Sequence, residues 1–115
     1  MLKKQNRLSS TFEYNVTRKY GSKIDSPYFV IYFLKPTNYQ GPTKIGIVVS
    51  TKIHKRAVKR NYLKRIFRSM TEVFVNMLPV NTWIVIQPKK LCLDSTYEKI
   101  STDFNKALQK NIITH

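Results

Sequence analysis

The segment from residue 51 to residue 68 is strongly basic and has the pattern of an amphipathic helix. Eight of the seventeen residues from Lys52 to Arg68 are lysine or arginine. Apolar residues recur at helical spacing and predict a stripe that must pack on another element. The expected stripe comprises Val58, Tyr62, Leu63, Ile66, Phe67, Met70, Val73, Phe74 and Met77. A row spaced i, i+4, i+8 is expected on the opposite face: Arg60, Lys64 and Arg68, flanked by Asn61 and Arg65.

Three apolar runs around this helix have the composition of β-strands: residues 28–34, 44–50 and 83–86. They are rich in aromatic and β-branched residues and are bounded by Gly, Pro or Asn. In the second run, alternation places Gly46, Val48 and Ser50 on one low, open face. In the first run, we expect the face that carries Tyr28 and Tyr32 to border a groove.

Two further helices are predicted near the ends of the chain. Ser10 and Glu13 have the spacing of a capping box, and this helix should end near Gly21. Ser95 and Glu98 repeat the spacing and predict a last helix with Ile100, Phe104 and Leu108 on one stripe. With no repeats or long linkers, the 115 residues are expected to form one domain, with a short flexible basic N-terminus at about 1–8.

The charge of the chain predicts a polyanionic partner. The formal net charge is +15, and residues 26–71 contain ten lysines and arginines but no aspartate or glutamate. Like charges at i, i+4 destabilise a helix by roughly 0.2–0.5 kcal/mol per pair, so stability alone does not favour this row. A solvated face is the simpler explanation, but such faces usually mix charges of both signs. Phosphate groups are the natural counter-charge, because Lys and Arg displace the cations condensed on nucleic acid.

Little in the sequence points to catalysis by the polypeptide. The six acidic residues are scattered without a paired-carboxylate motif, and no Cys/His cluster has the spacing of a metal site. His54 and Cys92 are interpreted as structural residues. No catalytic or metal-ligating residue is therefore predicted. The chain also has no apolar signal-peptide region and no run long enough to cross a bilayer, so a cytoplasmic location is expected.

At the basic helix the sequence resembles the protein component of bacterial ribonuclease P. The resemblance lies in Ile45-Gly46-Ile47-Val48-Val49-Ser50-Thr51-Lys52 followed by Arg56-Ala57-Val58-Lys59-Arg60-Asn61-Tyr62-Leu63-Lys64-Arg65-Ile66-Phe67-Arg68. This is similar to the family's glycine-containing strand and its Arg-Asn-Arg helix. Tyr62 stands at the third position of that motif, Arg18 where the family often has an aromatic residue, and Thr51 where it has a lysine.

The resemblance implies an α/β (α+β) two-layer sandwich of order αβββαβα, ribosomal protein S5 domain 2-like. Its four-stranded mixed sheet would include a left-handed βαβ crossover through the basic helix. The resemblance also implies a catalytic RNA subunit that removes the 5′ leader of precursor tRNA, with Mg²⁺ held mainly by the RNA subunit and the substrate. The protein would bind that RNA and the leader, and would aid binding of magnesium and substrate.

Two surfaces are predicted for these partners. The RNA-subunit surface comprises Lys52, Lys55, Arg56, Arg60, Asn61, Lys64, Arg65 and Arg68. The leader-binding cleft comprises Tyr14, Arg18 and Tyr32, the tyrosines matching family positions where bases stack on aromatic rings.

Other classes of protein share part of this pattern. A ribosomal or general RNA-binding protein without a processing role would have the same charge and the same α/β pattern. A helix-turn-helix DNA regulator is disfavoured because strands, not a second helix, flank the basic helix. A membrane-active helix is disfavoured because its apolar stripe has a sheet to pack on. No DNA partner and no membrane are expected.

Overall fold

The computed structural model describes residues 6–8, 10–37, 39–74 and 77–110. The helices and strands follow one another in the order αβββαβα, as predicted, with one short 3-10 helix before the last helix. They are α1 (Thr11–Tyr20), β1 (Ser22–Asp25), β2 (Phe29–Leu34), β3 (Lys44–Ile47), α2 (Ala57–Phe74), β4 (Trp83–Pro88), η3 (Lys90–Asp94) and α3 (Tyr97–Leu108).

The four strands form one mixed sheet in the spatial order β1-β2-β4-β3. β2 pairs antiparallel with both β1 and β4, whereas β3 pairs parallel with β4. The parallel pair is joined through α2, as the predicted βαβ crossover requires. The left-handed sense of this crossover stays a prediction. Residues Trp83–Ile86 of β4 are buried on both faces of the sheet, which explains why this run is continuously apolar.

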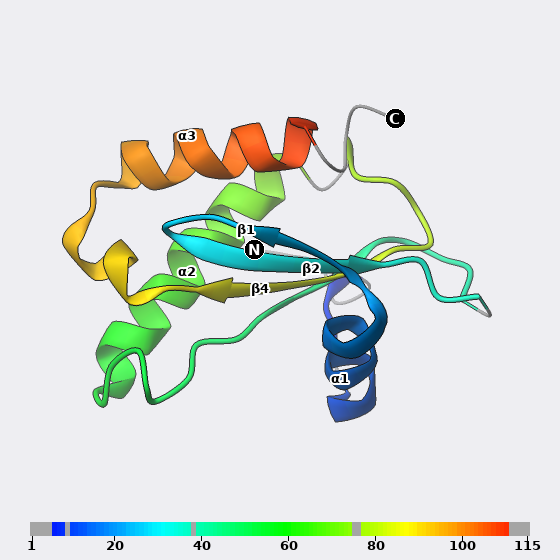
Figure 1. Ribbon diagram of the computed structural model, residues 1–115, viewed down its shortest axis with the longest axis horizontal. Helices are drawn as coiled ribbons and strands as arrows, with labels where there is room; N and C mark the ends of the chain where they lie inside the picture. The colour runs from blue at the N-terminus through cyan, green and yellow to red at the C-terminus, as the bar shows by residue number, and fades with distance from the viewer. Residues whose placement is uncertain (1–5, 9, 38, 75–76, 111–115) are drawn as a thin grey trace.

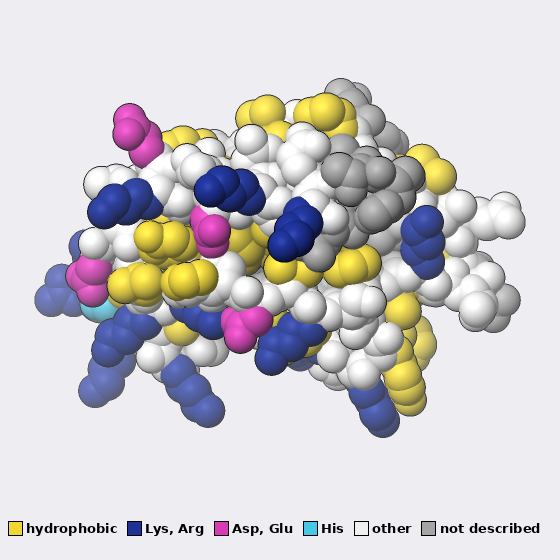
Figure 2. All heavy atoms as spheres, turned by 45° about the horizontal axis from the view of Figure 1, so that its top comes forward, with side chains coloured by type: hydrophobic (Ala, Val, Ile, Leu, Met, Phe, Trp, Pro, Cys, Tyr) yellow, Lys and Arg dark blue, Asp and Glu magenta, His cyan; other side chains and the backbone are white. Residues whose placement is uncertain are grey.

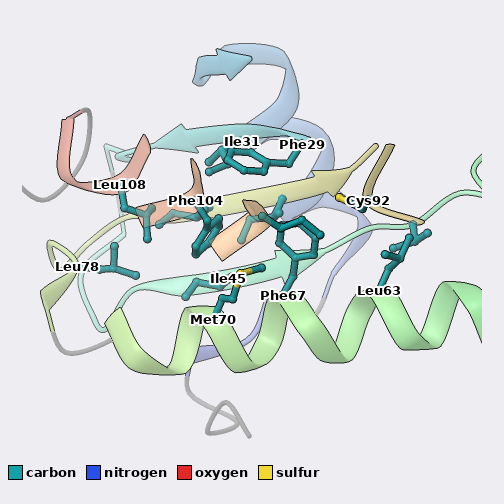
Figure 3. Close-up of a cluster of buried hydrophobic side chains, with 14 residues drawn as sticks. Phe29, Ile31, Ile45, Leu63, Phe67, Met70, Leu78, Cys92, Phe104 and Leu108 are labelled. Carbon is teal, nitrogen blue, oxygen red and sulfur yellow. The ribbon is translucent and has the colours of Figure 1, made fainter. Parts of the chain in front are cut away.

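One face of the sheet packs on α2 and α3 and forms the main hydrophobic core (Figure 1). Phe29 of β2, Phe67 of α2 and Phe104 of α3 meet edge to face, with ring centroids 5.6–6.0 Å apart. Figure 3 shows Phe67 and Met70 directed from α2 toward the sheet. The predicted stripe of α3 is confirmed, since Ile100, Phe104 and Leu108 are all buried. The sheet with α2 and α3 forms the predicted two-layer sandwich.

The other face of the sheet carries α1 and a smaller cluster. Leu8, Trp83 and Val85 are its buried members, and Tyr14 and Tyr32 pack against them. The predicted capping box begins α1: Ser10 Oγ accepts from the amide of Glu13, and the Glu13 carboxylate accepts from the amide of Ser10, both at 3.2 Å.

The helix ends at Gly21, also as predicted. A Cβ at Gly21 would lie 2.5 Å from the carbonyl oxygen of Thr17 and 2.7 Å from that of Phe33. The close approach of helix and strand therefore requires glycine at this position.

Residues 6–8, the end of the segment predicted to be flexible, make hydrogen bonds to the chain around β3. Asn6 Nδ2 donates to the carbonyl of Thr43 at 2.9 Å, and Leu8 N donates to that of Ile45 at 3.0 Å. These contacts hold the segment along the outer edge of β3. Residues 1–5 lie outside the described residues.

The apolar stripe predicted for the basic helix is too wide. Leu63, Phe67 and Met70 are buried, but Val58 is 72% exposed and Tyr62 is 51% exposed. Val73 and Met77 are also exposed, and Met77 lies beyond the end of α2. The helix rests on the sheet along a narrow line, so only side chains at the centre of the stripe reach the core.

Three local predictions also need correction. β3 ends at Ile47, although Val48 N still donates to the carbonyl of Ile86 at 2.9 Å. Thr96, not Ser95, caps α3, because its hydroxyl accepts from the amide of Lys99 while Ser95 Oγ donates to Leu91 O. Tyr28 precedes β2 and packs against the main core, so it does not share the face of Tyr32.

Candidate nucleic-acid interface

The predicted basic surface divides between α2 and the loop before it. Because α2 begins at Ala57, three residues of the surface lie in the loop and five lie on the helix. Figure 2 shows Lys and Arg side chains projecting at its lower left, where the N-terminal half of α2 lies. The loop residues are Lys52, Lys55 and Arg56, and the helix residues are Arg60, Asn61, Lys64, Arg65 and Arg68. All are exposed except Arg60 and Lys64, which are half-buried.

The row Arg60, Lys64 and Arg68 runs along a flank of α2, not opposite the apolar stripe as predicted. Half-burial of its first two members shows that the row borders the packed side of the helix. Arg68 is close enough to Tyr14, on the other face of the sheet, to act on its ionisation. The row therefore follows the β3 side of α2, and Asn61 and Arg65 are the more outward-facing residues.

Arg60 holds the basic loop in place. Its Nη1 donates to the carbonyls of His54, at 3.0 Å, and Lys55, at 2.7 Å. The ring nitrogen Nδ1 of His54 accepts from the amide of Arg56 at 3.0 Å, just before the helix begins. These bonds give His54 the structural role expected of it and position Lys55 and Arg56 at the N-terminus of α2.

The start of α2 attracts anions for two reasons. The N-terminus of a helix carries a partial positive charge and exposed amides, which favour phosphate and disfavour cations. Here the first turn contains no acidic residue, and exposed Lys55, Arg56 and Lys59 surround it. Since these cations oppose the helix dipole, the arrangement favours anion binding at the expense of stability.

A groove of about 240 Å³ lies between the end of α1 and the segment after β3. Val30 of β2, Gln87 of β4 and Val48 form adjacent positions across its floor, as the register of the strands indicates. Arg18 of α1 lines one side, and its Nη2 donates to Asn15 Oδ1 at 2.9 Å. Its other lining residues are Ser50, Ile53, Pro88 and Lys89.

Tyr14 and Tyr32 lie beside this groove on the same face of the sheet. Tyr32 is opposite Val85, one row along from the Val30–Gln87 pair. Tyr14 lies over Gly46, so that a Cβ on Gly46 would come within 2.3 Å of the ring. The open face expected at Gly46, Val48 and Ser50 is therefore open only at the last two.

The charge of the groove comes from Arg18 and Lys89, and the Tyr14 phenol beside it is neutral. Burial raises the pKa of Tyr14 above its ordinary value while Arg68 acts in the opposite direction, so the phenol is neutral near pH 7. Lys89 Nζ lies 2.5 Å from Asp25 Oδ1, and this hydrogen bond lowers the pKa of the Asp25 carboxyl. Lys89 is thus partly neutralised, and Arg18 is the exposed cation lining the groove.

The structure brings the three predicted cleft residues to one face and adds others. Of these others, Val48 and Ser50 belong to the face of residues 44–50 that the sequence predicted to be open. Alternation along the first run placed Val30 on the face of Tyr32, which was expected to border a groove. No signal in the sequence indicated Gln87, because its exposure depends on how far α1 covers the sheet.

No group of three or more His, Cys, Asp or Glu residues that could hold a metal ion occurs among the described residues. Cys92 is buried, and its Sγ donates to the carbonyl of Tyr28 at 2.9 Å. Burial raises the pKa of this thiol to about 11, so it is protonated near pH 7. Within the described part of the chain, no helix is both long and apolar enough to span a bilayer.

Comparison with known proteins gives one consistent family. A family model described as ribonuclease P matches residues 2–111. A ribonuclease P protein component from Rippkaea orientalis is 31% identical over 112 residues, covering 95% of this chain and 88% of the relative. One from Nitratiruptor sp. is 28% identical over 103 residues, covering 90% and 89%.

Solved structures agree with the sequence relatives. The RNase P protein from Thermotoga maritima superposes with a TM-score of 0.77 at 25% identity, covering 90% of this chain and 96% of that one. The Staphylococcus aureus RNase P protein superposes with a TM-score of 0.83 at 22% identity, covering 96% and 99%. The order of elements and the mixed sheet described above are thus those of a known fold.

Proposed function

The chain belongs to the ribonuclease P protein family, and from this premise we propose how it serves the enzyme that removes the 5′ leader of precursor tRNA. It is the protein subunit of this endoribonuclease. In the proposal, hydrolysis of the phosphodiester bond belongs to the RNA subunit, and the protein binds that RNA and the leader. One observation carries the proposal: Ser50 and Ile53 line the groove beside α1, and they belong to the same loop before α2 that carries exposed Lys52, Lys55 and Arg56.

In this proposal α2 and the loop before it dock on the RNA subunit. Lys55, Arg56 and Arg65 are exposed and offer charge to phosphate groups, and guanidinium groups can grip phosphate oxygens bidentately. Arg60 acts differently, because its guanidinium bonds to the loop carbonyls. We assign to it the positioning of the loop.

The groove beside α1 would receive the single-stranded leader. Its floor is largely apolar, Arg18 supplies a cation for the backbone, and Tyr14 and Tyr32 lie alongside. Aromatic rings stack on any base, so this contact would demand no particular leader sequence.

Magnesium would be held mainly by the RNA subunit and the substrate. The described residues offer no cluster of carboxylates or histidines that fits a metal of the protein's own. The cations of α2 would aid magnesium binding indirectly, because neutralising phosphates lets two RNA surfaces approach each other.

The direct test adds the purified chain to a bacterial ribonuclease P RNA at low magnesium and measures 5′ cleavage of precursor tRNA. We expect cleavage to be stimulated, and stimulation to fall for Arg65→Ala. Lys99→Ala, which removes an exposed charge from α3, is the matched control and should behave as the unmodified protein. Retained RNA binding without stimulation would contradict the proposal and favour a general RNA-binding role.

A further inference from the structure

A second cavity lies on the opposite flank of α1 from the groove. Phe12, Val16 and Tyr20 are spaced i, i+4, i+8, whereas Tyr14 and Arg18 occupy the other side of the helix. The cavity has a volume of about 480 Å³, within the range of ligand pockets. It opens between α1, which lies on the far side of the sheet from α3, and the chain that leaves β2 (Figure 1). Its lining residues are Phe12, Val16, Tyr20, Leu34, Lys35, Pro36, Thr37, Tyr39 and Trp83.

Aromatic rings dominate the walls of this cavity. Phe12 is 68% exposed and Tyr20 is 66% exposed, although both are large and apolar. Tyr39 and Trp83 lie deeper, with ring centroids 5.5 Å apart at an angle of 50°. Two exposed aromatic side chains at the mouth of an aromatic cavity are typical of a site for a flat ligand, since rings stack on one another.

Positive charges surround these rings. The amine of Lys19 lies 5.4 Å from the ring centre of Tyr20, and the amine of Lys44 lies 5.4 Å from that of Tyr39. Lys44 also pairs with Glu13 Oε2 at 3.1 Å, so Lys19 and Lys35 supply most of the positive charge. Exposed Lys35 lines the cavity itself. An apolar peptide would meet no complementary charge here, whereas a nucleotide pairs a flat base with a negative phosphate.

Trp83 adds a hydrogen-bonding feature. Its side chain is buried in the cavity wall, and its indole N–H finds no acceptor among the described residues. Buried polar groups normally have partners, so a ligand with an acceptor that reaches this N–H would satisfy it. Nucleobases carry carbonyl and ring-nitrogen acceptors around a flat apolar centre.

We infer that this cavity binds an unpaired nucleobase of single-stranded RNA, with the adjoining phosphate near Lys35. The inference rests on the proposed function in taking RNA as the ligand. It adds a second base-stacking site, so that single-stranded RNA contacts both flanks of α1. Phe12 and Tyr20 would cover the bound base from the solvent side.

The chain contains a single tryptophan, so the fluorescence of Trp83 reports directly on the cavity. The experiment titrates the full chain with a short oligouridylate while recording fluorescence and, separately, the anisotropy of labelled RNA. We expect Trp83 to be quenched as the RNA binds. Phe12→Ala and Tyr20→Ala should each weaken binding about fivefold or more, as loss of one stacked base predicts.

Tyr97→Ala is the matched control, because Tyr97 is 49% exposed but lies on α3. It should leave both affinity and quenching unchanged. RNA binding without any change in Trp83 fluorescence would overturn the inference, as would unchanged affinity of the Phe12 and Tyr20 variants. Quenching by a phenylalanine-rich peptide and not by oligouridylate would also overturn it, by assigning the cavity to a protein partner.

The experiments distinguish failure of this inference from failure of the proposed function. Stimulated cleavage of precursor tRNA by a protein whose Trp83 does not respond to RNA would remove only the second site. Quenching by oligouridylate without stimulated cleavage would keep the site and contradict the role in the enzyme.

Discussion

Gly46 determines how closely Tyr14 approaches the sheet. A Cβ at this position would lie 2.3–2.4 Å from two ring carbons and the hydroxyl oxygen of Tyr14, which is too close for the ring to stay in place. We therefore expect Gly46→Ala to lower the free energy of unfolding by about 1–3 kcal/mol, the usual cost of overpacking. Urea unfolding measures this change.

The same variant has a built-in control in the Tyr14→Ala background. If the ring causes the loss, Gly46→Ala should cost little there, and the two substitutions should be strongly non-additive. Equal costs in both backgrounds would mean that the extra methyl group meets something other than Tyr14.

Cys92 should make stability depend on pH in the alkaline range. Burial raises the pKa of its thiol from 9.0 to about 11, so the folded state retains the proton over an interval in which the unfolded chain loses it. Its contribution is complete below pH 9 and is lost as the pH rises toward 11, by about 3 kcal/mol in total. Unfolding free energies of the unmodified chain and Cys92→Ala, compared at pH 8 and pH 11, should converge at the higher pH. A constant difference would contradict the assignment.

Substitution of Tyr32 tests the leader contact separately from the other contacts to the substrate. It packs on the smaller cluster but remains half-buried beside the groove. Tyr32→Ala should weaken binding of leader-bearing precursor tRNA by about 1–3 kcal/mol, the value of one stacked base, and spare mature tRNA. Tyr32→Phe keeps the ring and should bind both normally. Equal losses for the two RNAs would exclude Tyr32 from the leader site.

At the scale of elements, the basic residues of α2 have two proposed roles: some contact RNA, and others position the loop before the helix. Arg65 is exposed, whereas Arg60 donates to the carbonyls of His54 and Lys55. Arg65→Ala should reduce affinity for the RNA subunit and lower the slope of log K against log salt by about 0.7–0.9, as one lost phosphate contact predicts. Arg60→Ala should reduce affinity with little change in slope.

Binding measured over a series of salt concentrations tests this distinction. A slope that falls equally for both variants would show that Arg60 also contacts phosphate. Arg60→Lys retains the charge on a side chain one bond shorter, so its amine should not reach both carbonyls and the variant should resemble Arg60→Ala in affinity.

Elements with a strong local signal were predictable from the sequence. The capping box of α1, the apolar run of β2 and the stripe of α3 each appear where expected. β1 has no such signal: Ser22–Asp25 is mostly exposed at the edge of the sheet, and pairing with β2 alone makes it a strand. The α2 stripe was overestimated because the sequence does not show how much of a helix its neighbours cover.

At the scale of the whole molecule, the sequence showed which segment carries the charge but not which surfaces lie next to it in the fold. The acid-free segment identified α2 as the basic element, and the family resemblance supplied Tyr14, Arg18 and Tyr32. That the loop before α2 borders the groove depends on the crossover and on the α1 packing, which bring distant residues together. Tertiary packing of this kind leaves no pattern in the residues themselves.

The net charge of +15 should make this fold more stable as salt is added, even while RNA binding weakens. The molecule measures 39 × 28 × 25 Å. At 0.01 M salt the Debye length of about 30 Å lets charges repel across it, whereas at 0.1 M about 10 Å confines repulsion to neighbours. The free energy of unfolding by urea should therefore rise between these concentrations. Lys64→Ala with Arg65→Ala removes two like charges from α2 and should reduce that rise. A stability that falls with salt would show that attractive pairs, not self-repulsion, dominate the folded state.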